Sequence, residues 1–131
     1  MYILRKSFSW EASHWLPNVP NNHKCRRVHG HSYRMVLEIG SRVLSQGMVV
    51  DYKNISTSAK HIVNLFDHQM INDFLTNPTA ELIATYCSQT FIRQFRIDHP
   101  SLVFGKELYL IAVEISETAN TNCRYEVNEK L

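Results

Sequence analysis

The sequence predicts an α+β domain in which an antiparallel sheet carries two helices on one face. Two extended segments with apolar residues at every second position come first, two segments of helical period follow, and two more extended segments end the chain. This order, strand-strand-helix-helix-strand-strand, lets consecutive strands pair as hairpins beneath a layer of helices. We expect one domain over residues 1–131, because no repeat, linker or low-complexity segment divides the chain.

The first two strands are expected from about Tyr2 to His14 and from about His31 to Val43. In the first, the even positions are apolar, and in the second the odd positions are, with Tyr33, Met35, Leu37 and Ile39 in phase. The connection between them, residues 15–28, carries two prolines and is long for a compact domain. Loops of this length are usually functional or disordered.

Two helices are expected in the middle of the chain. The first should begin a few residues after Asp51, and its buried face is predicted to hold Ile55, Ala59, Ile62, Val63 and Phe66. The second should begin at Asn77, as an N-cap followed by proline in the first turn, and run to about Phe95. Residues 98–101, Asp-His-Pro-Ser, are predicted to end it.

The last two strands are expected from Leu108 to Thr118 and from Cys123 to Val127, joined by a turn over residues 119–122. The longer strand is apolar at odd and even positions alike, which is typical of a strand covered on both faces. Two helices can cover only one face of a small sheet. We therefore expect the other face to meet another subunit.

The composition is that of an ordinary globular protein: 44% of the residues are hydrophobic, 20% are charged, and the formal net charge is +2. This charge gives no reason to expect nucleic-acid or membrane binding. The N-terminal residues lack the apolar core of a signal peptide, and no stretch is long and apolar enough to cross a bilayer. With three cysteines and no secretory leader, we expect reduced thiols and a cytoplasmic protein.

Three histidines are predicted to converge at one corner of the sheet. His29 and His31 share one face of the second strand and continue its apolar phase, while His14 ends the first strand in its apolar phase. In an antiparallel hairpin the end of one strand lies beside the start of the next. Three imidazoles with a vacant fourth position are the pattern of catalytic zinc.

Cys25 lies just before these histidines, within a segment that also holds Lys24, Arg26 and Arg27. The thiol could be a fourth metal ligand, which would close the site and make it structural, although the spacing is not that of a zinc finger. The basic cluster is either a solvated turn or an attraction for an anionic substrate. Cys87 is expected in the core.

Several carboxylates could belong to a site or have a purely structural role. Glu117 ends an apolar strand face, where it could anchor a ligand with adjacent N–H donors or bend out to water. Glu81, in the first turn of the second helix, could simply complement the helix dipole. At the end of the first helix, His68 could simply interact with the helix dipole. Alternatively, Asp67 and His68 could form a base-tuning pair, although consecutive helical residues point about 100° apart.

Taken together, these residues resemble the family of 6-pyruvoyl-tetrahydropterin synthases and 6-carboxytetrahydropterin synthases. The similar segments are residues 8–14 (FSWEASH), Cys25 with 29–31 (HGH), 48–52 (MVVDY), 66–68 (FDH), 78–81 (PTAE) and 117–118 (ET), in the order of the family and over nearly the whole chain. Two departures, Ser56 where relatives often have lysine and Ala119 where they often have cysteine or proline, put little in doubt.

The resemblance implies a tunnelling fold, in which sheets of three subunits join into a β-barrel and two trimers stack as a homohexamer. It implies Zn²⁺ on His14, His29 and His31. It implies that Cys25 is the catalytic base, and that Asp67 and His68 relay protons across a subunit boundary. It also implies that Glu117 anchors the pterin ring, with Glu81 and Thr79 beside it.

Only three residues separate Cys25 from the first histidine of the HGH segment. This short gap resembles the bacterial 6-carboxytetrahydropterin synthases of the 7-deazaguanine and queuosine pathway. It implies conversion of 7,8-dihydroneopterin triphosphate to 6-carboxy-5,6,7,8-tetrahydropterin, with release of acetaldehyde and triphosphate. The alternatives are a 6-pyruvoyl-tetrahydropterin synthase, which eliminates triphosphate, and a non-enzymatic zinc-stabilised module closed by Cys25.

Overall fold

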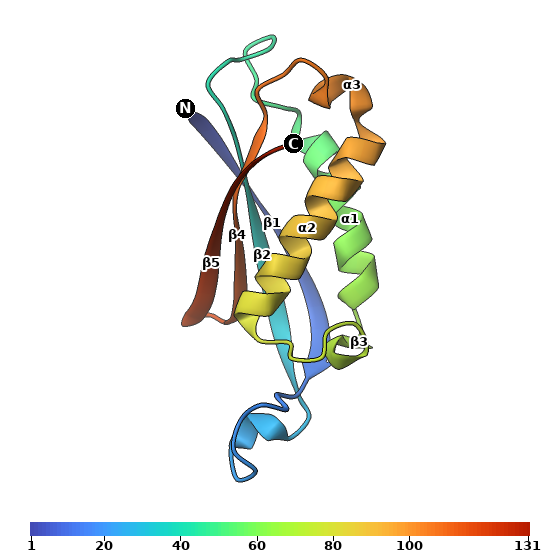
Figure 1. Ribbon diagram of the computed structural model, residues 1–131, viewed down its shortest axis with the longest axis vertical. Helices are drawn as coiled ribbons and strands as arrows, with labels where there is room; N and C mark the ends of the chain where they lie inside the picture. Colours follow the sequence, from blue (N-terminus) through green and yellow to red (C-terminus); the bar gives the residue numbers. More distant parts are fainter.

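The computed structural model describes residues 1–131 and contains one five-stranded sheet with two long helices on one face (Figure 1). The strand order is β3-β1-β2-β4-β5. Strands β1 (Tyr2–His14) and β2 (His29–Ser41) pair antiparallel along their whole length. Strands β4 (Tyr109–Thr118) and β5 (Thr121–Lys130) form the second hairpin, and β4 pairs with β2. The predicted α+β class and order of long elements are confirmed.

The helical layer consists of α1 (Tyr52–Phe66) and α2 (Ala80–Asp98). Their apolar faces close a core against the even positions of β1 and the odd positions of β2. The largest side chains that are fully buried there are Trp10, Tyr33, Phe66, Phe91 and Phe95. Cys87 is buried in the same core, as predicted. None of the helices is long and apolar enough to cross a membrane.

Four short elements were not predicted. Strand β3 (Gln69–Met70) runs parallel to the end of β1, so the sheet is mixed instead of purely antiparallel. A 3-10 turn, η2 (Ile71–Asp73), follows it, and α3 (Pro100–Val103) follows the end of α2. A further 3-10 turn, η1 (Lys24–Arg26), lies in the β1–β2 loop. Elements of two to four residues span only about one period of the strand or helix pattern, so periodicity cannot detect them.

The predicted helix starts were wrong because the capping side chains differ from those expected. Asp51 caps α1 directly, since its Oδ1 accepts a hydrogen bond from the Lys53 N–H at 2.8 Å, and the helix begins at the next residue. The N-cap of α2 is Thr79 instead of Asn77: its hydroxyl accepts from the Leu82 N–H at 3.2 Å. Strand boundaries also moved, with β2 beginning at His29 and β5 extending to Lys130.

A bulge at Ile111 changes the predicted phase of β4. In the pairing with β2, Glu38 lies opposite Ala112 and Ile39 lies opposite Leu110, so Ile111 is an extra residue. Leu110, Val113 and Ile115 therefore face the helices, whereas Ile111 turns to the opposite face. Sequence alternation had placed Ile111 with Val113 and Ile115.

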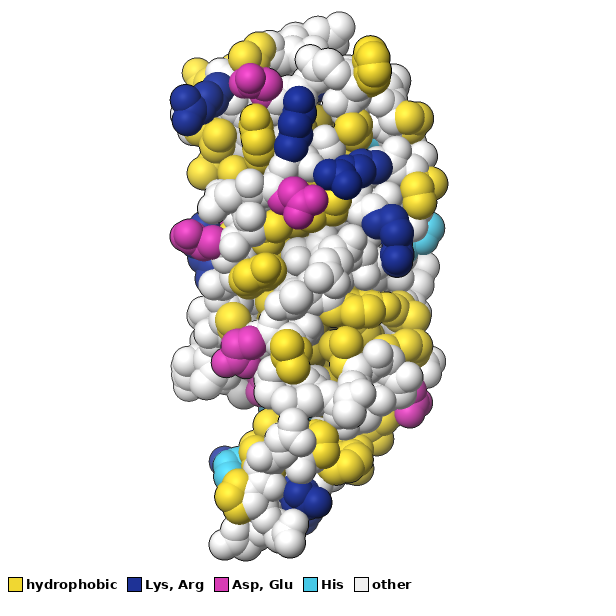
Figure 2. Space-filling view, in the orientation of Figure 1, with side chains coloured by type: hydrophobic (Ala, Val, Ile, Leu, Met, Phe, Trp, Pro, Cys, Tyr) yellow, Lys and Arg dark blue, Asp and Glu magenta, His cyan; other side chains and the backbone are white.

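The face of the sheet without helices carries a network of charges. Glu38, with a side chain only 8% exposed, binds Arg5 at 3.2 Å and Arg124 at 2.6 Å. Arg5 and Arg124 also bind Glu114 and Glu126 respectively, so the network extends over β1, β2, β4 and β5. The two guanidinium groups hold the pKa of Glu38 below its usual range, chiefly through the hydrogen bonds from Arg124. On the face shown in Figure 2, acidic and basic side chains are likewise interspersed.

A substitution at Gly40 tests the packing of Ile111 at the bulge. A Cβ at this position would lie 2.8 Å from Cγ1 of Ile111, so we expect Gly40→Ala to lower the free energy of unfolding by about 1–3 kcal/mol. Urea denaturation of Gly40→Ala, Ile111→Ala and the double variant measures this. Ile111→Ala removes Cγ1 and Cδ1 of Ile111, and the remaining close atom, Sδ of Met1 at 2.8 Å, ends a flexible side chain that can move. The glycine substitution should therefore cost less in the Ile111→Ala background. Equal costs in both backgrounds would contradict the packing.

Candidate functional site

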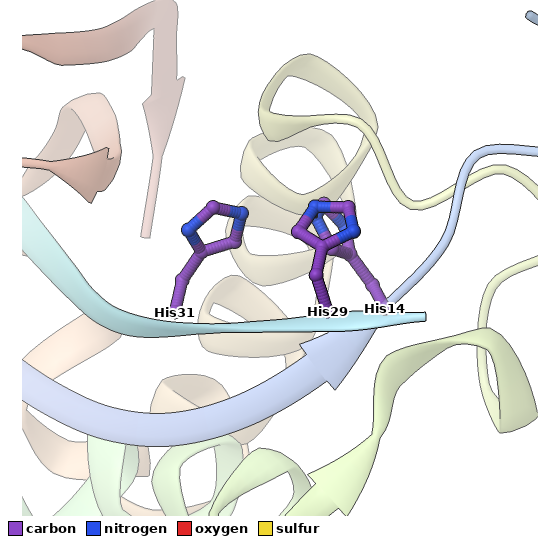
Figure 3. A group of neighbouring side chains, drawn as sticks. All are labelled: His14, His29 and His31. Carbon is purple, nitrogen blue, oxygen red and sulfur yellow. The ribbon is translucent and has the colours of Figure 1, made fainter. Parts of the chain in front are cut away.

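The three predicted histidines meet where the β1–β2 hairpin opens (Figure 3). His14 pairs directly with His29 across the two strands, and His31 pairs with Ala12, so all three rings stand on the helix-covered face. His14 is 1% exposed, and the other two are half-buried. The possible ligand atoms of the three residues all lie within 4.8 Å of one another.

Backbone carbonyls fix the orientation of two of these rings. The Nδ1 of His14 lies 2.8 Å from the Pro78 carbonyl, and the Nδ1 of His29 lies 2.7 Å from the Arg27 carbonyl. A carbonyl oxygen only accepts, so each Nδ1 carries a hydrogen and, in the neutral ring, each Nε2 carries a lone pair. This outer hydrogen bond is the usual arrangement of metal-bound histidine.

The inner nitrogen atoms lack protein partners that would satisfy them. The Nε2 atoms of His14 and His29 face each other at 3.0 Å, and two lone pairs at that distance need a cation between or beside them. The Nε2 of His31 is buried without a hydrogen-bond partner, and the nearest carboxylate oxygen, Oε2 of Glu117, is 3.5 Å away. Burial lowers the pKa of His14 and of His31, which favours the neutral form that binds metals. The three residues can thus hold a metal ion.

Cys25 does not belong to this group of ligands. It lies in η1, within the β1–β2 loop, and is half-buried. The group of potential ligands therefore consists of three histidines, which leaves coordination positions open for water or a ligand. The alternative in which the thiol closes the site has no support from this arrangement.

Glu117 lines a cavity of about 380 Å³ next to the histidines. Its wall brings together the first turn of α2, the β4–β5 turn and the start of the β1–β2 loop: Leu16, Thr79, Ala80, Glu81, Glu117, Thr121, Asn122 and Cys123. Three residues to which the sequence assigned a ligand-binding role, Thr79, Glu81 and Glu117, are thus in one place. Sequence reasoning gave Cys123 no role. Burial and the Glu81 carboxylate raise the pKa of its thiol, which keeps it neutral.

Asp67 and His68 form a pair within one chain. The expectation that consecutive helical residues cannot both point at one atom does not apply to them, because both residues lie beyond the end of the helix. Helix α1 ends at Phe66, and His68 adopts a left-handed backbone conformation with φ of 58°. Its Nδ1 then lies 3.0 Å from Oδ1 of Asp67. The Glu11 main chain holds both residues: its N–H donates to Oδ1 of Asp67 at 3.0 Å, and its carbonyl accepts from the His68 N–H at 2.6 Å.

The pair lies apart from the cavity of Glu117. The bond from Glu11 is the main reason that the pKa of Asp67 is lowered, so this carboxyl group is ionised. The side chain of His68 is 78% exposed and lines a second hollow of about 500 Å³, which also includes Glu11, Ser32 and His31. His31 therefore belongs both to the histidine cluster and to the lining of the second hollow.

The profile of the family described as 6-pyruvoyl tetrahydropterin synthase matches residues 3–128. The chain belongs to this family. Among curated members, the 6-carboxy-5,6,7,8-tetrahydropterin synthase of Synechocystis sp. is 35% identical over 133 residues, which cover 95% of this chain and 93% of the relative. The Haemophilus influenzae protein of the same name is 27% identical, covering 96% and 99%.

Solved structures of the family share the fold of this member. The 6-pyruvoyl tetrahydropterin synthase of Caenorhabditis elegans superposes with a TM-score of 0.73 at 22% identity, over 96% of this chain and 95% of that one. The Plasmodium falciparum enzyme of that name gives 0.71 at 17% identity, over 96% and 98%. The predicted tunnelling fold of the subunit is confirmed.

Removing one ring should remove the metal. We expect His29→Ala or His31→Ala to lose at least about tenfold in zinc affinity, because two imidazoles remain where three converge. His61→Ala is the matched control, since His61 is a half-exposed histidine of α1 outside the cluster. Elemental analysis after dialysis gives the metal content. Full occupancy in either site variant would contradict the cluster.

Proposed function

We propose that the protein is a zinc-dependent 6-carboxy-5,6,7,8-tetrahydropterin synthase, a carbon–carbon lyase. It converts 7,8-dihydroneopterin triphosphate and water to 6-carboxy-5,6,7,8-tetrahydropterin, acetaldehyde and triphosphate. The observation that carries the proposal is the open three-histidine cluster with Glu117 3.5 Å from the Nε2 of His31. The names of the curated relatives and the short gap between Cys25 and His29 support it.

The cavity of Glu117 receives the pterin ring. Its volume of about 380 Å³ lies within the range of small-molecule sites. A carboxylate presents two acceptor oxygens, which fit the adjacent N–H donors on the edge of a pterin. Thr79 and Glu81 line the same cavity and add polar contacts around the ring.

The side chain of the substrate extends from this cavity toward the three histidines. His14, His29 and His31 hold Zn²⁺ through ring nitrogens, the usual zinc ligands. When bound, the ion supplies a Lewis acid that stabilises negative charge developing on the side-chain oxygens. Cys25, as thiolate, takes a proton from a carbon of that side chain and so acts as general base.

Asp67 and His68 relay protons to and from the reaction. Asp67 accepts from Nδ1 of His68 and fixes that tautomer, which leaves the Nε2 of the exposed ring free to exchange a proton. Because His68 lines the second hollow instead of the Glu117 cavity, we place the relay at a subunit boundary, where the cysteine loop of a second copy enters.

This boundary belongs to a homohexamer in which two trimeric barrels stack. Two unpaired sheet edges support the proposal. The whole of β5 forms one edge, and β1 forms the other except where β3 covers its end. Exposed edges of this length pair readily with other chains, and closing them into a barrel removes both.

The reaction products test the function. Purified protein with bound zinc is incubated with 7,8-dihydroneopterin triphosphate, and the pterin products and acetaldehyde are identified by mass spectrometry. We expect 6-carboxy-5,6,7,8-tetrahydropterin and acetaldehyde in equal amounts. A dominant 6-pyruvoyl-tetrahydropterin peak without acetaldehyde would instead assign the protein to triphosphate elimination.

Cys25→Ala should abolish turnover while leaving the metal in place. Loss of a general base typically costs about 10²–10⁴-fold in kcat. The three histidines should retain zinc because the thiol is not among the ligands. Zinc content and kcat are measured on the same preparation. Parallel loss of zinc would make Cys25 a ligand and support the structural zinc module.

Glu117→Gln should weaken pterin binding. Loss of a charge-assisted hydrogen bond costs about 1.5–3 kcal/mol, or roughly a 10–100-fold increase in Kd. Fluorescence titration with sepiapterin measures the affinity. Glu107→Gln, at an exposed position outside the cavity, is the control. Equal affinity in the two variants would exclude the anchoring role.

A further inference from the structure

The three basic residues around Cys25 differ in their surroundings. The guanidinium of Arg26 is half-buried inside the β1–β2 loop, where Nη1 donates to the carbonyls of Pro17 at 2.8 Å and Val19 at 3.1 Å. Lys24 and Arg27 are exposed, and their side chains form no hydrogen bond or ion pair within the chain. Only Arg26 connects the two limbs of the loop, residues 15–19 and 24–28, through its side chain.

Cys25 depends on the same two limbs for its position. Its carbonyl accepts a hydrogen bond from the Leu16 N–H at 2.8 Å, and its own N–H donates to Nδ1 of His23 at 3.0 Å. Leu16 in turn lines the cavity of Glu117. The backbone of the cysteine is thus one hydrogen bond away from the wall of the proposed pterin cavity.

The body of the domain holds the loop at the roots of its two limbs. In the second limb, the Nδ1 of His29 in β2 donates to the Arg27 carbonyl at 2.7 Å. Asn72 in η2 forms two hydrogen bonds with the main chain of Trp15: its Oδ1 accepts from the N–H at 2.9 Å, and its Nδ2 donates to the carbonyl at 2.8 Å. Beyond this clamp the loop extends from the end of the sheet as a narrow projection (Figures 1 and 2). A projecting loop has little packing to fix it, so internal hydrogen bonds determine its conformation.

We propose that Arg26 is a positioning residue that fixes Cys25 relative to the cavity of Glu117. Its two bonds keep the limb that carries Cys25 against the limb that carries Leu16. The catalytic role of Cys25 rests on the proposed function. A displacement of about 1 Å in a reacting group can lower the rate about a hundredfold. The link between the limbs therefore determines the rate at which the Cys25 thiol takes a proton from the substrate.

The competing role for Arg26 is attraction of an anionic substrate. That role needs donors that point outward, and here the bonded donors point to carbonyls of the same loop. If Arg26 acted by attraction, Lys24 and Arg27 would contribute as much as Arg26 does, because attraction over about a Debye length depends on charge alone. Removing Lys24 therefore removes the same charge beside Cys25 without removing either hydrogen bond.

The test compares Arg26→Ala, Arg26→Lys and Lys24→Ala in the zinc-loaded protein. For each, we measure kcat and KM with 7,8-dihydroneopterin triphosphate, the zinc content, the melting temperature, and the alkylation rate of Cys25 by iodoacetamide, followed by peptide mass spectrometry. Cys87 and Cys123 in the same digest serve as internal references, since Cys87 is buried and Cys123 is half-buried.

We expect Arg26→Ala to lower kcat by about ten- to a hundredfold with KM and zinc content nearly unchanged. Alkylation of Cys25 should become about threefold faster or more, because the loop opens more often. Arg26→Lys keeps the charge but not the planar guanidinium, so it should recover only part of kcat. Lys24→Ala should match the parent protein in all four measurements.

Two results would overturn the proposal. Equal increases of KM in Arg26→Ala and Lys24→Ala, with greater loss at low salt, would assign both residues to substrate attraction. Unchanged alkylation and unchanged kcat in Arg26→Ala would show that the link between the limbs does not matter. If the parent protein has no activity on this pterin, the proposed function fails, and the alkylation rates still decide whether Arg26 positions Cys25.

Discussion

The register of β1 against β2 is the constraint on which the site depends. The pairing runs without interruption from Tyr2 opposite Ser41 to His14 opposite His29. Side chains alternate between the faces of a sheet, so a slip of one residue would turn His29 and His31 away from His14. The apolar side chains in phase with these histidines form the core under the helices, and their burial makes such a slip costly. Core packing and the geometry of the three histidines are therefore fixed by the same pairing.

The helical layer contributes to the site through its ends and not through its buried faces. The entry to α2 supplies the Pro78 carbonyl that orients His14, together with Thr79 and Glu81 in the cavity. The exit from α1 supplies the Asp67 and His68 pair, which Glu11 of β1 holds by two main-chain bonds. Both helix ends lie over the same end of the first hairpin, so residues far apart in the sequence meet there.

Sequence alone predicted the parts that follow from long-range periodicity. The three histidines, their common face and the two-helix layer all come from patterns that extend over many residues. The sequence did not predict features that depend on a single local contact, namely the cap of α2 at Thr79, the bulge at Ile111 and the two-residue β3. The position of the His68 side chain beside Asp67 was also not predicted, because it requires a residue in the left-handed conformation just after the helix. The role of Arg26 could not be read from the sequence, since its partners are carbonyls, which every residue carries.

The carbonyls of Pro78 and Arg27, which orient His14 and His29, have a consequence for how the site tolerates mutation. A side-chain carboxylate in this role could be deleted by one substitution, whereas a carbonyl is kept whatever residue occupies the position. The sequence around the three histidines can therefore change without loss of these hydrogen bonds, as long as the backbone path is preserved. What positions 27 and 78 must supply is a backbone conformation, and a proline, which restricts that conformation, occupies one of them.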